Sequence, residues 1–181
     1  MERSKLEEKS QKAINKQRIN TPQIEEHIGM KMSELIFDTN ICSWKRHTTV
    51  LPDLLFNKKD ILIVIENDIG EYIACYLDIQ INEIGEYTTN EKACIFSWKD
   101  GEIKKHSVVD TTLFTVHHPN KEKLFEMGEK DLVVYKYNRK EESYCQPSDQ
   151  FFHEKELKTY FPSNEEKRFV PERIQIRLAF T

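Results

Sequence analysis

An unbroken aliphatic run at residues 61–65, with the sequence ILIVI, constrains the fold of this chain more than any other segment. Four of its five residues are β-branched, which favours a strand, and the run is short for a buried helix. Successive side chains of a strand point to opposite sides of the sheet, so an uninterrupted apolar strand needs cover on both faces. The run therefore predicts a strand with packed side chains above and below it.

Other short apolar segments, separated by polar turns, also predict strands. Residues 72–81 form the longest of them, and Leu77, Ile79 and Ile81 alternate along it. Asp100 and Gly101 suit the two positive φ angles of a type I′ turn, so we expect a tight hairpin there. The remaining segments are residues 35–37, 93–96, 113–116, 124–125 and 132–135.

The last predicted strand has the clearest alternation of apolar and polar residues. We expect one face to be apolar and the other to carry polar side chains, because the side-chain period of a strand is two residues. The apolar face is Ile174, Ile176, Leu178 and Phe180, and the polar face is Arg173, Gln175 and Arg177.

Helix signals are scarce. Residues 47–55 combine a threonine suited to an N-cap, Pro52 in the first turn, and Val50, Leu51, Leu54 and Leu55 at helical spacing. A second helix is expected near residues 24–28 and ends at Gly29. With 181 residues, the chain fits one domain. We predict an α+β fold: a mainly antiparallel two-sheet β-sandwich with one or two covering helices.

Residues 1–21 differ from the rest of the chain. Six Lys or Arg residues face three Glu residues there, and apolar side chains are few. We interpret this stretch as a polar N-terminal helix or tail, set off by a break at Thr21-Pro22 from a domain at residues 22–181. An arm that binds nucleic acid is the functional alternative. A formal net charge of −4 argues against a generally basic nucleic-acid binder.

The targeting signals that can be read from the sequence indicate a cytoplasmic protein. No apolar segment follows the polar N-terminus, and no apolar run is long enough to span a membrane. The four cysteines, at positions 42, 75, 94 and 145, have no C-x-x-C spacing. We expect reduced thiols, with Cys75 and Cys94 acting as small core residues.

The sequence contains no pattern that specifies a cofactor or a metal. It lacks the glycine-rich phosphate-binding motifs and the G-x-S-x-G nucleophile motif. His117 and His118 are adjacent, so on a strand they would point to opposite faces. Glu66, Asn67 and Asp68 are expected to form a polar turn and not a calcium loop.

Cys145 is a candidate nucleophile, because His153 follows it by eight residues. A reactive thiol needs a neighbouring base and an electropositive surrounding. The alternative interpretation, which we favour, is a structural cysteine.

The order of segments resembles the TLDc family, the domain of the oxidation-resistance proteins. The resemblance extends from about Ile28 to Phe180 and looks like that of a divergent, protist-like member. Ile69 stands where the family has a phenylalanine, Trp98 where it has a leucine, and Gln175 where it has an acid. The segments that carry the resemblance are residues 34–39 (ELIFDT), 61–65 with 68–72 (ILIVI and DIGEY), 94–98 (CIFSW), 124–134 (LFEMGEKDLVV), 143–145 (SYC) and 169–180.

The resemblance implies a protein-interaction module and not an enzyme. Family members are linked to oxidative-stress protection and, in several cases, to regulation of the vacuolar proton-pumping ATPase (V-ATPase). The implied partner is therefore a protein, with a V-ATPase subunit as the candidate, and no cofactor is implied. The positions that match the family pattern, and so are candidates for partner contact, are Asp38, Asp68, Gly70, Ser97, Gly128, Asp131, Ser143, Cys145 and Arg173.

Most of these nine residues are expected to serve the fold: glycines in turns, Asp131 accepting hydrogen bonds from turn amides, and Ser97 bonding at a strand edge. Three functional hypotheses remain, in this order. The first is the interaction module, the second a thiol enzyme or peroxide scavenger that uses Cys145, and the third a nucleic-acid binder that uses residues 1–21.

Overall fold

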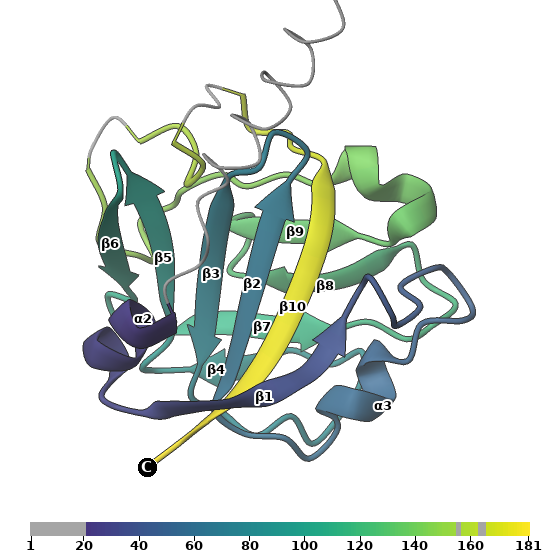
Figure 1. Cartoon of the computed structure of the whole chain (residues 1–181). Helices are drawn as coiled ribbons and strands as arrows, with labels where there is room; N and C mark the ends of the chain where they lie inside the picture. Colours follow the sequence, from purple (N-terminus) through teal and green to yellow (C-terminus); the bar gives the residue numbers. More distant parts are fainter. Residues whose placement is uncertain (1–20, 155–156, 163–165) are drawn as a thin grey trace, which may run out of the picture.

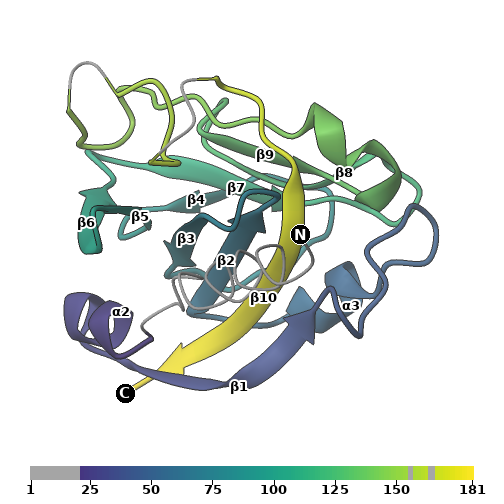
Figure 2. The same ribbon diagram turned by 45° about the horizontal axis from the view of Figure 1, so that its top comes forward.

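The computed structural model describes residues 21–154, 157–162 and 166–181. These residues form two antiparallel β-sheets that pack against each other, with short helices at the margins (Figures 1 and 2). The predicted α+β β-sandwich is therefore confirmed. The polar helix or tail predicted at residues 1–21 lies, apart from Thr21, outside the described residues.

The larger sheet has six strands in the order β1-β10-β2-β3-β5-β6. Its last strand in sequence, β10, lies between β1 and β2 and pairs antiparallel with both (Figure 1). The two ends of the described chain are therefore joined within one sheet. The strands are β1 (Lys31–Asp38), β2 (Ile61–Asn67), β3 (Tyr72–Leu77), β5 (Cys94–Lys99), β6 (Glu102–Ser107) and β10 (Pro171–Phe180).

The smaller sheet has four strands in the order β4-β7-β8-β9. It lies behind the larger sheet in the view of Figure 1, while α2 lies on the near side. The strands are β4 (Thr88–Asn90), β7 (Thr112–Val116), β8 (Lys123–Met127) and β9 (Leu132–Tyr135), and the helices are α2 (Thr21–Ile28), α3 (Leu51–Leu55) and the 3₁₀ helix η1 (Tyr137–Glu142).

Strand β2 is buried along its whole length, as its sequence predicts. Ile61, Ile63 and Ile65 pack into the core between the two sheets. Leu62 and Val64 point the other way, into a second cluster that contains Ile24 of α2. Burying each of these side chains contributes about 2 kcal/mol. Helix α2 therefore contributes Ile24 to the apolar cluster on the second face of β2.

The hairpin between β5 and β6 forms the tight turn that the sequence predicts. Asp100 and Gly101 have φ angles of 52° and 79°, both positive, as a type I′ turn requires. The turn fixes the pairing of the two strands, so that Ser97 lies opposite Lys104 and Ile95 lies opposite His106. This register places the side chains of Ser97 and His106 on one face of the sheet.

Two strand predictions need correction. Strand β3 ends at Leu77 and not at Ile81, because the chain leaves the sheet and Ile81 exchanges backbone hydrogen bonds with Asn57 and Lys58. The alternation of β10 also stops early. Phe180 is 51% exposed, whereas Ala179 is buried and packs in the cluster on the α2 side.

The helix predictions are correct in position but not in detail. The N-cap of α3 is Val50, which is 40% exposed and makes no side-chain cap. The nearest threonine contact comes from Thr49, whose hydroxyl accepts a hydrogen bond from the Leu51 amide at 3.3 Å. Helix α2 ends before Gly29 as expected, but Thr21 and Pro22 lie in its first turn and not in a break. Proline fits there because a first-turn amide has no partner within the helix.

Candidate functional site

Six of the nine candidate residues are buried: Asp38, Ser97, Gly128, Asp131, Ser143 and Cys145. Arg173 and Gly70 are half-buried, and Asp68 is exposed. The structure does not gather the nine into one site. It distributes them over five places in the fold, each with its own contacts.

Asp38 and Arg173 join the first and last strands. The Arg173 guanidinium donates from Nη2 to Asp38 Oδ2 at 2.7 Å and from Nε to Oδ1 at 3.2 Å. Asp38 Oδ1 also accepts a hydrogen bond from the Asn40 amide. Burial acts to raise the pKa of Asp38, but the bonds from Arg173 and Asn40 outweigh it and lower that pKa. The pair fastens β1 to β10.

Asp68 and Gly70 lie in the turn between β2 and β3. Asn67 organises this turn, because its Oδ1 accepts hydrogen bonds from the Ile69 and Glu71 amides. The polar turn that the sequence predicts at Glu66, Asn67 and Asp68 is present but begins later, because Glu66 and Asn67 are buried residues at the end of β2. Its tip carries Ile69, which is 62% exposed. The turn borders a pocket of about 300 Å³ whose other walls include Glu141, Arg168 and Val170.

Gly128 and Asp131 form the turn between β8 and β9. Gly128 has a φ of 69°, and a Cβ placed on it would lie 2.3 Å from Asp131 Oδ2, so only glycine fits. The Asp131 carboxylate does not bind the turn amides as expected. It accepts hydrogen bonds from the Ser148 amide and hydroxyl at 3.0 and 2.7 Å and from the Tyr160 hydroxyl at 3.1 Å. Asp131 therefore anchors the segment that follows η1.

Ser143 and Cys145 are both fully buried. The Ser143 hydroxyl accepts a hydrogen bond from the Tyr135 amide at 3.0 Å and so holds the chain after η1 against β9. Cys145 Sγ lies 2.9 Å from Thr159 Oγ1, and burial raises the pKa of its thiol.

His153, the base that the thiol hypothesis requires, is engaged elsewhere. Its two ring nitrogens contact the backbone carbonyls of Ser148 and Glu154, each at 2.8 Å. A buried thiol with a raised pKa is a weak nucleophile, because only the thiolate attacks. Neither half of the proposed pair is arranged for thiol chemistry.

Ser97 has a different partner, which the sequence reasoning did not identify. Its Oγ lies 2.7 Å from His106 Nε2, and both residues are buried. The other ring nitrogen, Nδ1, lies 3.3 Å from the Phe152 carbonyl oxygen. A carbonyl oxygen can only accept, so the proton of a neutral ring belongs on Nδ1. Nε2 is then the acceptor, and the Ser97 hydroxyl donates to it.

Backbone pairing fixes the histidine in this orientation. The Phe152 amide donates to the Ser107 carbonyl at 2.8 Å, which ties residue 152 to the end of β6 and sets its own carbonyl beside His106. Burial, together with the charges of His153 and Lys104, lowers the pKa of His106. The ring is therefore neutral and able to accept a proton near pH 7.

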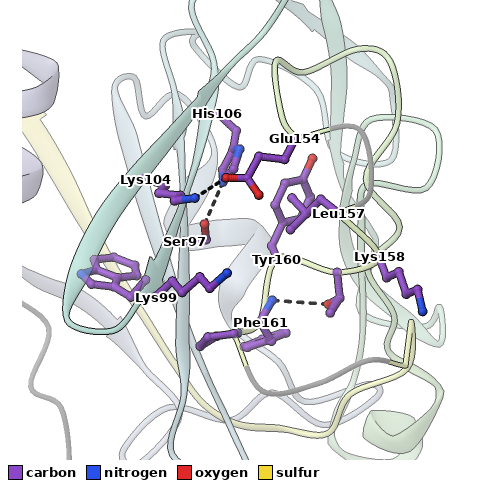
Figure 3. Close-up of a pocket in the computed structure, with 12 residues that line it drawn as sticks. Ser97, Lys99, Lys104, His106, Glu154, Leu157, Lys158, Tyr160 and Phe161 are labelled. Carbon is purple, nitrogen blue, oxygen red and sulfur yellow. Dashed lines mark hydrogen bonds and ion pairs between the residues drawn. The ribbon is translucent and has the colours of Figure 1, made fainter.

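The Ser97–His106 pair lies in the wall of a pocket of about 350 Å³ (Figure 3). One wall is the β5–β6 hairpin, and the other is the segment around residues 157–162. This second segment contributes Leu157, Tyr160 and Phe161, which give the pocket an apolar side. Its position depends on the Asp131–Tyr160 bond described above.

Charged side chains also line this pocket. Lys99, Lys104 and Lys158 contribute three positive charges, and Glu154 contributes one negative charge. Lys104 lies directly opposite Ser97 in the β5–β6 ladder and forms an ion pair with Glu154. The pocket therefore carries a net positive charge beside a serine hydroxyl that donates to a neutral histidine.

The described part of the chain lacks two kinds of feature. None of its residues form a group of three or more His, Cys, Asp or Glu side chains that could hold a metal ion. None of its helices has the length and apolar character needed to cross a membrane. All four cysteines are free thiols.

No protein-family model matches the chain, and no curated protein matches it significantly.

Proposed function

We propose that this chain is a TLDc-like protein-interaction module that acts in oxidative-stress response or in regulation of the V-ATPase. Two observations support the proposal. The chain folds as a two-sheet β-sandwich. Six of the nine residues that match the TLDc pattern are buried within that fold. Four free thiols agree with a reducing compartment, and we propose the cytoplasm.

The observation that carries the proposal is the exposed tip of the β2–β3 turn. Ile69 is 62% exposed, and Asn67 Oδ1 accepts two backbone hydrogen bonds in the turn beneath it, from the Ile69 and Glu71 amides. Asp68 stands beside it on the surface, and the Asp68 amide donates to the Val170 carbonyl. A fixed apolar side chain among polar neighbours is a suitable anchor for a protein partner.

The experiment measures binding of the full chain to purified V-ATPase by surface plasmon resonance. We expect the wild-type chain to bind and Ile69→Asp to lose at least tenfold in affinity, because a charge replaces the apolar anchor. Ile41→Asp is the matched control, because Ile41 is 87% exposed on the loop after β1. Absence of wild-type binding, or equal losses in both variants, would reject the proposed role.

A further inference from the structure

We infer that Ser97 is a nucleophile activated by His106, and that the pocket beside it accepts carboxylic esters that carry a negative charge. This inference goes beyond the proposed interaction role and uses different residues. It stands on the geometry of the Ser97–His106 pair and on the residues that line the pocket.

The first argument is the chain of hydrogen bonds. A serine hydroxyl becomes a useful nucleophile when a base takes its proton and a third group orients that base. Here the base is His106 Nε2, 2.7 Å from Ser97 Oγ, and the orienting group is the Phe152 carbonyl at Nδ1. The carbonyl also stabilises the imidazolium that forms when His106 accepts the proton.

The second argument is the position of the pair in the fold. Ile95, two residues before Ser97 and on the same face of β5, packs into the core between the sheets. Hydrophobic side chains would satisfy that core, yet this edge of it holds a serine and a histidine in the wall of a pocket. A purely structural pair would need no access to a pocket of about 350 Å³.

The third argument concerns the ligand. Leu157 and Phe161 offer an apolar surface for the acyl chain of an ester. The three lysines outnumber the single Glu154, so a negatively charged group on the substrate is favoured over a neutral one. Lys104 lies opposite Ser97 and is ion-paired with Glu154. In the proposed reaction its ammonium would also attract the carbonyl oxygen that becomes negative during attack.

The reaction balances without a cofactor. Ser97 Oγ forms a bond to the ester carbonyl carbon while its proton moves to His106 Nε2. The carbon–oxygen bond to the leaving alcohol then breaks, and His106 returns the proton to that alcohol. Water, the second substrate, adds to the acyl-serine through the same base and releases the carboxylate and free Ser97.

The first experiment treats the full chain with a fluorophosphonate probe, followed by intact mass and peptide mapping. We expect one adduct, on Ser97, which is absent in Ser97→Ala. His106→Gln should slow labelling by about 100-fold or more, because it removes the general base. Ser43→Ala, on the loop after β1 and outside this pocket, is the matched control and should label like wild type. Circular dichroism spectra verify that each variant is folded.

The second experiment compares two esters, 4-nitrophenyl acetate and the anionic mono-4-nitrophenyl succinate. We expect faster release of nitrophenol from the succinate, and Lys104→Met should reduce that preference several-fold, on the order of fivefold for one nearby charge. Adduct formation that persists in Ser97→Ala, or no adduct on folded wild type, would overturn the inference. Equal rates for both esters in wild type would overturn its charge selectivity.

Different variants test the interaction role and the esterase activity. Ile69→Asp should label with the fluorophosphonate like wild type, because Ile69 does not line the Ser97 pocket. Ser97→Ala should in turn leave V-ATPase binding unchanged.

Discussion

Arg173 on the last strand holds Asp38 at the end of the first strand through two hydrogen bonds, across a separation of 135 residues. Replacing Arg173 with methionine leaves a nearly buried carboxylate without its charged partner. Losing the partner of a buried polar group costs about 1–3 kcal/mol. We expect Arg173→Met to lower the free energy of unfolding by about 2 kcal/mol in urea denaturation.

A double-mutant cycle tests whether this loss comes from the pair itself. Asp38→Asn removes the charge that Arg173 binds. In that background, Arg173→Met should therefore lower the free energy of unfolding by less than it does in the wild-type chain. If the double variant loses the sum of the two single losses in unfolding free energy, to within about 0.5 kcal/mol, the two residues are not directly coupled.

Gly128→Ala should destabilise the chain more than Gly29→Ala does. Both glycines have a positive φ, 69° and 70°, so both variants lose about 1–2 kcal/mol to backbone strain. A Cβ at position 29 meets nothing within 4 Å, whereas one at position 128 lies 2.3 Å from Asp131 Oδ2. We expect an additional loss of about 1–3 kcal/mol at position 128. Thermal unfolding of both variants measures the difference, and equal losses would show that the turn relaxes freely.

Lys136→Met should be strongly destabilising although it exchanges one long side chain for another. Lys136 is fully buried, and its ammonium donates to the carbonyls of His118, Lys121 and Lys123. Methionine leaves these acceptors without their charged donor, which costs about 3 kcal/mol. Lys130→Met, at an exposed position, is the control and should change stability by less than about 0.5 kcal/mol. Similar denaturation midpoints for both variants would contradict this role.

Glu126 should make the stability of the fold depend on pH in the acid range. Burial acts to raise the pKa of Glu126, but hydrogen bonds from His117, Tyr87 and Lys123 lower it to about 2, from an ordinary 4.5. The unfolded chain binds the proton first, so this stabilisation is complete above about pH 4.5 and is lost as pH falls towards 2. It amounts to about 3 kcal/mol.

The measurement is chemical denaturation of wild type and Glu126→Gln between pH 2 and 6. The difference in unfolding free energy between the two should shrink by about 3 kcal/mol as the pH falls through this window. A constant difference would mean that the carboxylate charge does not contribute. The other carboxylates that titrate in this range are present in both chains. Their contribution therefore cancels in the difference in unfolding free energy between wild type and Glu126→Gln.

Local patterns predict the fold well where burial is dense. The aliphatic run of β2 requires packing on both faces, and the structure shows the core between the sheets on one face and a cluster that includes Ile24 of α2 on the other. Asp100-Gly101 predicts its turn because few other residue pairs tolerate two positive φ angles. The same turn also predicts the register of β5 and β6, so the proximity of Ser97 and His106 could have been derived by counting outwards from it.

The contacts that the sequence did not predict are those made by loops far apart in the chain. Asp131 meets Ser148 and Tyr160 because the segment after η1 folds back over the β8–β9 turn, and no periodic pattern marks such a return. For a related reason, the sequence pattern places the end of β3 at Ile81, four residues beyond its actual end at Leu77. Ile79 and Ile81 keep the alternation of a strand, but their backbone has left the sheet to pair with residues 57 and 58.

The insertion of β10 between β1 and β2 bears on how the molecule is made. During synthesis, the larger sheet stays divided until residues 171–180 emerge from the ribosome. Until then, β1 and β2 each have an edge that lacks its β10 partner. Unpaired edges of this kind can pair with other chains until β10 is inserted. Premature termination shortly before β10 would release a product that lacks the seam of its own larger sheet.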